Sequence, residues 1–251
     1  MELVAISTTT RLGSKTKAER YAALVATRKQ CRKCHDTVNP SSCVNGRFDT
    51  TEQLGPWSDW QGNLDAEIMV VGQEWGGTNN YIGQSGKDSD GDPTNYNLLT
   101  LMKNIGREVP PPSDLQGSPK QGQFFFTNGV LCLRNGAATS SGQKNDISAG
   151  SFVQCGLSFL RPQIELIKPR AVLVLGRLPW VGLMKSFGLT TGSRHGETVD
   201  SGSVSLNEHT IAIPLFHCGA RSTNMNRPLP TQILDWGRGI KALDFVQKPT
   251  A

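Results

Sequence analysis

Four short apolar runs stand out when hydrophobic and polar positions are followed along the chain. Runs that are almost continuously apolar over this length are typical of strands buried on both faces, and therefore of a parallel sheet. The runs are Glu67–Gly72 (EIMVVG), Phe124–Asn128 (FFFTN), Ala171–Gly176 (AVLVLG) and Thr210–Phe216 (TIAIPLF).

Segments with apolar residues at helical spacing lie before, between and after these runs. They cover approximately Lys15–Gln30, Thr94–Ile105, Ile147–Ile167, Trp180–Phe187 and Thr231–Phe245. This alternation predicts a three-layer α/β/α fold in one domain, with a central four-stranded parallel sheet. We expect residues 1–15 to form a flexible N-terminus and residues 16–251 to form the domain. Residues 35–65, rich in Pro, Gly and Asn, are expected to form a long loop.

The composition is that of an ordinary globular protein, and it excludes some classes. Of 251 residues, 37% are hydrophobic and 19% are charged. No apolar run approaches the roughly 18 residues that a membrane-spanning helix needs, and the N-terminus does not read as a signal peptide. We therefore expect a cytoplasmic protein, in the bacterial cytosol or nucleoid, without a membrane partner. The net charge of +5 suits a polyanionic partner, but it does not identify one.

The six cysteines include a set with the chemistry of metal ligands. Cys31 and Cys34 form a C-x-x-C pair at the end of the first predicted helix, Cys132 follows the second strand, and Cys155 lies in the next helix. Soft thiolates suit zinc or an iron–sulfur cluster. A zinc module and buried free cysteines are the alternatives. Cys43 and Cys218 fit free thiols better, although Cys43 stays an alternative ligand.

Three polar side chains lie at or just after the ends of three of the predicted strands. Glu74 lies in the glycine-flanked loop after the first strand, Asn128 ends the second, and His217 follows the fourth. Because the carboxyl ends of parallel strands form one edge of a sheet, these side chains are expected at the same rim, where such folds bind ligands. A carboxylate can orient water, an amide can recognise a base edge, and an imidazole can stabilise developing charge. The alternative for each of these residues is a structural role, as a cap or as a solvated group.

This combination resembles the uracil-DNA glycosylase superfamily, and in particular its iron–sulfur family 4. The resemblance runs from Cys31 to about Pro230. It rests on the order of the cysteines, on FFFTNGVLC at 124–132, on LRPQIELIKPRAVLVLG at 160–176, and on a motif after the first strand and a histidine after the last.

The chain departs from family 4 in both of its short motifs. Motif one is usually G-E-A-P-G, whereas this chain has GQEWG at residues 72–76, closer to the G-Q-D-P-Y loop of family 1. Motif two is usually H-P-S, whereas this chain has HCGAR at residues 217–221. Gly76 stands where family 1 has a tyrosine that blocks the thymine methyl group, so the chain departs from family 1 at the position that excludes thymine. The spacing from Cys132 to Cys155 is longer than usual and carries a Gly/Ser-rich insert around residues 137–144.

The resemblance implies an enzyme that flips uracil out of DNA and hydrolyses its N-glycosidic bond, leaving an abasic site. Asn128 would read the uracil edge, a backbone N–H near Gln73 would bind O2, and Tyr81 would stack on the base, with Tyr96 and Trp75 as alternatives. The catalytic pair would be Glu74, which positions water and stabilises a cationic sugar, and His217, which hydrogen-bonds the departing base.

The resemblance also implies a cofactor and a partner. A [4Fe–4S] cluster would be held by Cys31, Cys34, Cys132 and Cys155. The partner would be uracil-containing DNA, with Arg221 as a DNA contact and the protein a monomer. Two other functions stay open. One is a glycosylase of the same fold for another deaminated base such as hypoxanthine, and the other is a non-catalytic iron–sulfur DNA-binding protein.

Overall fold

The four apolar runs form the parallel core of the central sheet. The computed structural model describes residues 15–114, 123–135, 146–192 and 194–245. The strands run in the spatial order β3-β2-β5-β7, and each neighbouring pair is parallel. They are β2 (Ile68–Gly72), β3 (Phe124–Asn128), β5 (Ala171–Leu175) and β7 (Ile211–Leu215), and almost all of their residues are buried. The predicted α/β class and parallel sheet are confirmed.

The central sheet has five strands rather than the four predicted. The fifth is β6 (Val204–Ser205), which pairs antiparallel with the edge of β7. A separate two-stranded sheet joins β1 (Thr37–Val38) to β4 (Leu133–Arg134). Strands of two residues are too short to show a hydrophobic period, so the sequence pattern did not reveal them.

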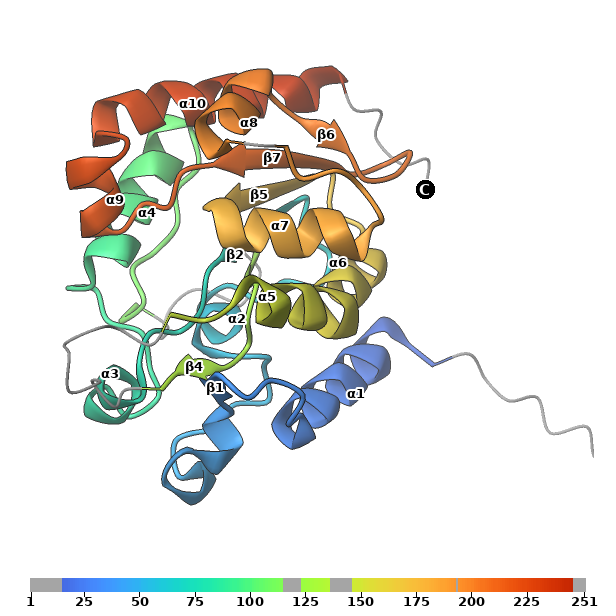
Figure 1. The fold of residues 1–251 in the computed structure, drawn as a ribbon, viewed down its shortest axis with the longest axis vertical. Helices are drawn as coiled ribbons and strands as arrows, with labels where there is room; N and C mark the ends of the chain where they lie inside the picture. Colours follow the sequence, from blue (N-terminus) through green and yellow to red (C-terminus); the bar gives the residue numbers. More distant parts are fainter. Residues whose placement is uncertain (1–14, 115–122, 136–145, 193, 246–251) are drawn as a thin grey trace, which may run out of the picture.

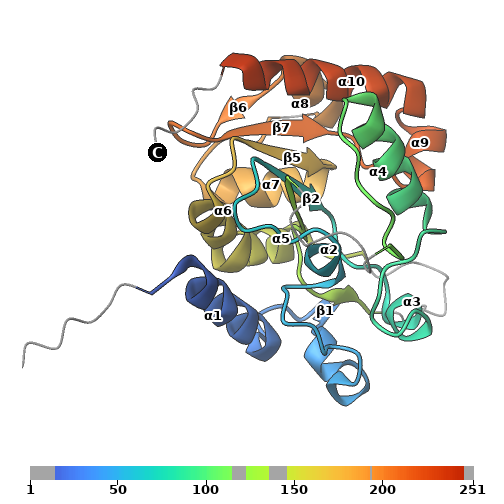
Figure 2. The same cartoon turned by 180° about the vertical axis from the view of Figure 1, so that it is seen from behind.

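Alternating side chains of each parallel strand pack into two cores, one on each face of the sheet. Met69 and Val71 join one core, whereas Ile68 and Val70 join the other. The first face is covered by α5 (Ala149–Cys155), α6 (Arg161–Ile167) and α7 (Arg177–Ser186). The second face is covered by α2 (Pro56–Trp60), α4 (Pro93–Asn104) and α10 (Leu229–Lys241). Figures 1 and 2 show the resulting three layers from opposite sides.

The predicted helices are present with small changes in their ends. The first, α1 (Lys17–Gln30), begins at a capping box between Thr16 and Glu19 and packs beside α6. The long helix predicted over 147–167 is continuous from α5 to α6, but it contains a π-helical segment, η2 (Gly156–Leu160). Such wide turns often occur at functional sites, and this one begins directly after Cys155.

Several short helices lie in segments without a predicted element. The expected loop over residues 35–65 contains β1, α2 and η1 (Pro40–Gly46). The others are α3 (Thr78–Gly83), α8 (His195–Ser201) and α9 (Ala220–Met225), whereas η3 (Ala242–Phe245) ends the helical segment predicted over Thr231–Phe245. Each is too short for the helical period to rise above the background.

The carboxyl ends of the parallel strands lie on the side of the molecule where α3, α9 and the start of α4 are found. Figure 1 shows the arrowheads of β5 and β7 pointing toward that side. None of the helices in the described parts of the chain is long and apolar enough to cross a membrane. The predicted flexible N-terminus, apart from Lys15, and the insert at 137–144 lie outside the described residues.

Candidate active site

The loop after β2 is joined by backbone hydrogen bonds to the segment that follows β3. Gly129 N–H donates to the Gly72 carbonyl at 2.9 Å, and Val130 N–H donates to the Gln73 carbonyl at 2.9 Å. Further along, Arg134 N–H donates to the Gly76 carbonyl, also at 2.9 Å. Gly76 has φ +81°, a backbone conformation that favours glycine. The position of the intervening Glu74 is therefore set by the main chain.

Glu74 lies at this rim in a partly dehydrated position beside a positive charge. Its side chain is 11% exposed, and its Oε1 atom is 2.8 Å from Arg134 Nε. The Nε–H group does not point along this line, so the contact is an ion pair rather than an aligned hydrogen bond. Burial raises the pKa of Glu74, nearby Arg134 opposes this rise, and Asp146 adds to it. Arg134 therefore favours the ionised form of a carboxylate whose pKa is raised by burial.

Asn128 is held over the end of β2. It is 2% exposed and pairs in register with Gly72. A methyl group on Gly72 would lie 2.4 Å from Asn128 Oδ1 and 2.8 Å from the Trp57 ring. Both contacts are shorter than side chains allow, so the amide and the indole need a glycine here. The structure thus packs Asn128 and Trp57 together at the strand end.

His217 follows β7 and has a defined tautomer. Its Nδ1 atom accepts a hydrogen bond from Gly219 N–H at 3.0 Å. The proton of the neutral ring must therefore be on Nε2, which leaves Nε2–H as a donor. Burial lowers the pKa of His217 to about 4; Asp92 opposes this and Arg134 adds to it. At neutral pH His217 is consequently a neutral hydrogen-bond donor rather than an acid.

These groups meet at one edge of the sheet. The charge of Arg134 acts on both Glu74 and His217. A methyl group on Gly176, the residue after β5, would lie 2.9 Å from Gln73 Nε2 and 3.5 Å from His217 Cβ, so Gln73 and His217 flank this glycine. The rim therefore combines a carboxylate, an amide and an imidazole. Their roles stay predictions.

The aromatic residues considered for base stacking lie in different surroundings. Tyr81 is 4% exposed and packs in a small cluster with Cys43 and Leu133, with its ring edge-on to Phe48. Trp75 packs closely on Gly55. Tyr96, on α4, is 65% exposed. Tyr81 is therefore covered by protein here, and its stacking role stays a prediction.

The two arginines after His217 differ in their partners. Arg221, the predicted DNA contact, is exposed on the short helix α9. Arg227 instead pairs with the buried Asp235 through two hydrogen bonds, of 2.9 and 2.8 Å, and lies over the Phe216 ring. Arg227 thus has the surroundings of a structural residue, whereas Arg221 is free to meet a partner from solvent.

The four predicted cluster cysteines line one pocket. Cys31 and Cys34 come from the segment after α1, Cys132 from the segment before β4, and Cys155 from the end of α5. Leu131 N–H donates to Cys155 Sγ at 3.4 Å. Among the described residues no group of three or more His, Cys, Asp or Glu has the arrangement of a single-ion site. Burial raises the pKa of Cys132 to about 12, so its free thiol would be a poor nucleophile.

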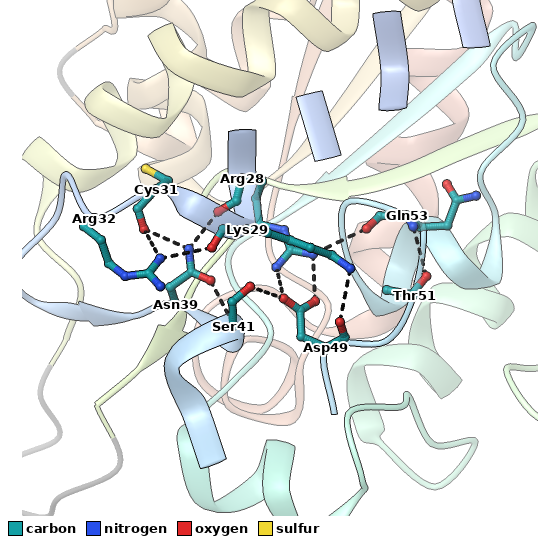
Figure 3. A network of polar contacts seen from close by, with 9 residues as sticks. All are labelled: Arg28, Lys29, Cys31, Arg32, Asn39, Ser41, Asp49, Thr51 and Gln53. Atoms are coloured by element: carbon teal, nitrogen blue, oxygen red, sulfur yellow. Dashed lines mark hydrogen bonds and ion pairs between the residues drawn. The ribbon is translucent and has the colours of Figure 1, made fainter. Parts of the chain in front are cut away.

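A buried polar network supports the segment that carries Cys31 (Figure 3). Arg28 and Asp49 form two hydrogen bonds, of 2.7 and 2.8 Å, with side chains only 1% and 3% exposed. Asn39 Nδ2 donates to the carbonyls of Arg28, at 2.7 Å, and Cys31, at 2.9 Å. Ser41 Oγ donates to Asp49. The network connects the end of α1 to the segment running from residue 39 to residue 53.

The two remaining cysteines lie elsewhere. Cys43 is 6% exposed in the cluster with Tyr81 and Leu133, and it is not among the residues that line the cysteine pocket. Cys218 is fully buried, its Sγ lies 3.5 Å from the Thr94 carbonyl, and its own carbonyl accepts from Asn97. These positions favour the reading of both as free thiols.

Comparisons with known proteins assign most of this chain to one family. The family model for the uracil DNA glycosylase superfamily matches residues 60–235. This chain belongs to the uracil DNA glycosylase superfamily. The Type-5 uracil-DNA glycosylase of Pyrobaculum aerophilum is 30% identical over 182 residues, which cover 69% of this chain and 74% of that protein. The predicted superfamily is therefore confirmed, while the likeness to family 4 in particular stays a prediction.

Sequence reasoning missed two arginines of this superfamily member, one beside Glu74 and one at the cysteine pocket. Arg134 was not singled out, although it follows the cysteine Cys132 by two positions. Arg28 was also missed, but it left a signal, because it falls at helical spacing from the buried Tyr21 and Val25 on α1. A charge on the apolar face of a helix indicates a buried partner, here Asp49.

Proposed function

We propose that this protein is a monofunctional uracil-DNA glycosylase that flips uracil out of DNA and hydrolyses the bond between base and sugar. The observation that carries this proposal is the meeting of Glu74, Asn128 and the Nε2–H donor of His217 at one rim of the sheet, in a chain of this superfamily. The relative from Pyrobaculum aerophilum is by name a uracil-DNA glycosylase, which supports the same activity here.

Base recognition is assigned to Asn128. A flipped base is read by hydrogen bonds to its Watson–Crick edge. The carboxamide offers a donor to uracil O4 and an acceptor to N3–H, whereas cytosine presents the opposite pattern. Because Asn128 is packed against Gly72 and Trp57, its amide is held in place before the base arrives. A backbone N–H near Gln73 contributes at O2.

Bond cleavage is assigned to Glu74 and His217. As the bond breaks, positive charge develops on the sugar and negative charge on the base. The carboxylate of Glu74 stabilises the sugar and positions the attacking water. The neutral His217 donates from Nε2–H to uracil O2, where the negative charge grows. Since water rather than an amine attacks, the product is an abasic site in an uncut strand.

The proposal includes a [4Fe–4S] cluster in the cysteine pocket, and two observations support it. Four thiols from three separate segments line it, and Leu131 N–H points to the sulfur of Cys155, as backbone donors do at iron–sulfur sites. A cluster holds each thiolate on a different iron, so its ligands lie farther apart than those of one metal ion. With Cys31, Cys34, Cys132 and Cys155 as ligands, the cluster would supply a covalent tie between the N-terminal segment and α5.

The partner in this proposal is uracil-containing DNA, which the protein binds as a monomer. The exposed Arg221 on α9 is assigned to the DNA near the flipped base, because α9 begins directly after the loop that carries His217. The net charge of +5 is consistent with a polyanionic partner. We expect the protein to act in the bacterial cytosol or nucleoid.

A panel of oligonucleotides with one lesion each tests the activity. The protein is incubated with strands that contain uracil, hypoxanthine, thymine or cytosine, and abasic sites are then revealed by alkaline cleavage. We expect cleavage at uracil after alkali and none before it. Cleavage without alkali would contradict water as the nucleophile, and a preference for hypoxanthine would assign the site to another deaminated base.

Asn128→Asp tests the recognition step within the same assay. The change replaces the amide donor to O4 by a charged acceptor. Single-turnover excision of uracil should fall roughly a hundredfold or more, the effect of losing a buried, oriented hydrogen bond. Asn63→Asp, at a loop position before β2, is the matched control and should excise uracil at the parent rate. An unchanged rate for Asn128→Asp would remove this residue from the base pocket.

A further inference from the structure

Arg134 is fixed relative to Glu74 by the main chain as well as by its own charge. The Arg134 N–H donates to the Gly76 carbonyl at 2.9 Å, and Arg134 forms an isolated parallel bridge with Gly77. The segment before Arg134 is itself bonded to Gly72 and Gln73. The hydrogen bonds between the segment Gly129–Arg134 and the loop after β2 therefore place the Arg134 guanidinium beside the Glu74 carboxylate.

The ion pair lies where water screens it poorly. Glu74 and Arg134 have side-chain exposures of 11% and 31%, and the two atoms nearest each other are 2.8 Å apart. In such surroundings an ion pair interacts more strongly than at an open surface, and the loss of one partner leaves the other charge uncompensated. The printed contact joins Arg134 Nε to Oε1 of Glu74.

Several charges surround the pair, and Arg134 is the cation that opposes the effect of burial. Asp146, which precedes α5, acts against the ionisation of Glu74, and Arg134 acts for it. At His217 the surrounding charges are Asp92, at the start of α4, and again Arg134. One guanidinium thus favours both a charged Glu74 and a neutral His217, which are the states that the proposed chemistry uses.

We propose that Arg134 is a positioning residue for the reaction: its guanidinium pairs with the Glu74 carboxylate and fixes its place at the rim, so that the carboxylate can orient the attacking water. This role rests on the proposed function of Glu74. In this role Arg134 acts through Glu74 rather than on the base or the sugar.

The pH dependence of excision separates this role from a general structural one. Arg134→Gln should lower single-turnover excision of uracil at neutral pH by roughly tenfold to a hundredfold, the scale of a misplaced reacting group. Without the guanidinium, burial raises the pKa of Glu74 further. Since excision needs the carboxylate, the acidic limb of the rate profile should move to higher pH, and the deficit should shrink as the pH rises.

Two variants sharpen the measurement. Arg134→Lys keeps a positive charge and should leave the acidic limb near its parent position, although the rate falls because the planar guanidinium is lost. Arg194→Gln removes an arginine from an exposed ion pair, with a side chain 83% exposed, and should behave as the parent. If Arg134→Gln lowers the rate by one factor at every pH, or leaves the limb unmoved, the positioning role is wrong.

An assay without substrate distinguishes this inference from the proposed function. Infrared difference spectra between the parent and Glu74→Gln follow the protonation of the Glu74 carboxyl directly, and the same difference is recorded in the Arg134→Gln background. We expect the titration midpoint to rise in that background. A raised midpoint in a protein that does not excise uracil would overturn the glycosylase proposal while keeping the charge coupling. An unmoved midpoint in an active enzyme would overturn the role of Arg134 alone.

Discussion

The rim site and the cysteine pocket are built in opposite ways. At the rim, Asn128 ends a parallel strand and Glu74 and His217 each follow one, so the regular sheet brings them together. The cysteine pocket has no such frame, because its thiols come from a segment after α1, a loop after β3 and the end of α5. It depends instead on long-range polar contacts such as Arg28 with Asp49. We therefore expect the pocket to be sensitive to distant substitutions and the rim to be sensitive to local ones.

The two regions also touch. The segment from Gly129 to Arg134 carries Cys132 and is bonded along the loop that carries Glu74. Arg28 lines the cysteine pocket and lies over the Trp75 ring, 5.6 Å from the ring centroid. Trp75 is the residue that follows Glu74 in the chain. We therefore expect a structural change in the cysteine pocket to reach the rim through this segment. A substitution that removes only a reacting group at the rim should leave the pocket unchanged.

The largest expected effect is on the pocket itself. Replacing Cys132 or Cys155 by Ser should remove the proposed cluster, because serine is a poor ligand for iron in a soft thiolate site. The measurement is iron and sulfide content after anaerobic purification, together with the brown absorbance near 400 nm that zinc sites lack. Cys43→Ser is the matched control and should keep the cluster. Bleaching by Cys43→Ser with retention by Cys155→Ser would show that the ligand set is wrong.

A distant substitution should then loosen the pocket. Asp49→Asn removes one partner of a buried ion pair and leaves Arg28 uncompensated, at a cost of about 3–5 kcal/mol in the free energy of unfolding. Burial alone would raise the pKa of Asp49, but hydrogen bonds from Arg28 and Ser41 hold it below its usual range. Its stabilisation is therefore present above the unfolded pKa and is lost as the pH falls.

Chemical denaturation as a function of pH checks this, and iron content after mild heating follows the pocket. Asp65→Asn, in an exposed pair with Lys17, should change stability by less than about 1 kcal/mol. Equal losses from the two variants would contradict the view that the pocket depends on the buried network.

Local substitutions at the rim should have the opposite signature. Glu74→Gln and His217→Ala should each lower single-turnover excision by roughly two or more orders of magnitude, as when one preorganised electrostatic group is removed. Iron content should stay at the parent level, and the affinity for uracil DNA should change far less, since phosphate contacts survive. Both quantities are measured at fixed salt. Parent-like excision by Glu74→Gln would end the carboxylate assignment.

The smallest expected effect concerns the pH profile of uracil excision, which should contain no step from the titration of His217. Because burial lowers the pKa of His217 to about 4, the ring stays neutral through the neutral range. Excision should therefore show no step near the usual histidine pKa of about 6.5, and His217→Gln should leave the position of any acidic limb unchanged. A limb near 6.5 that disappears in His217→Gln would mean that the ring acts as an acid.

Much of the rim was predictable from the chain alone. The four parallel strands were identified by apolar runs, since a strand buried on both faces leaves a local signal. The placement of Glu74, Asn128 and His217 at one edge followed from the rule that parallel strands end together. The superfamily followed from the order of motifs and cysteines, and the family comparison confirmed it.

Only the tertiary structure decided which side chains from different segments pair with one another. The contact of Arg134 with Glu74, the burial of Tyr81 beside Cys43, and the pairing of Arg28 with Asp49 each join residues from different segments. The two-residue strands β1, β4 and β6 exist only because a neighbour accepts their hydrogen bonds. Local periodicity reports which face of an element is buried, but a partner's identity depends on where distant segments meet. For that reason the sequence indicated the elements and the chemistry of the rim, whereas the electrostatic setting of that chemistry emerged only in the folded chain.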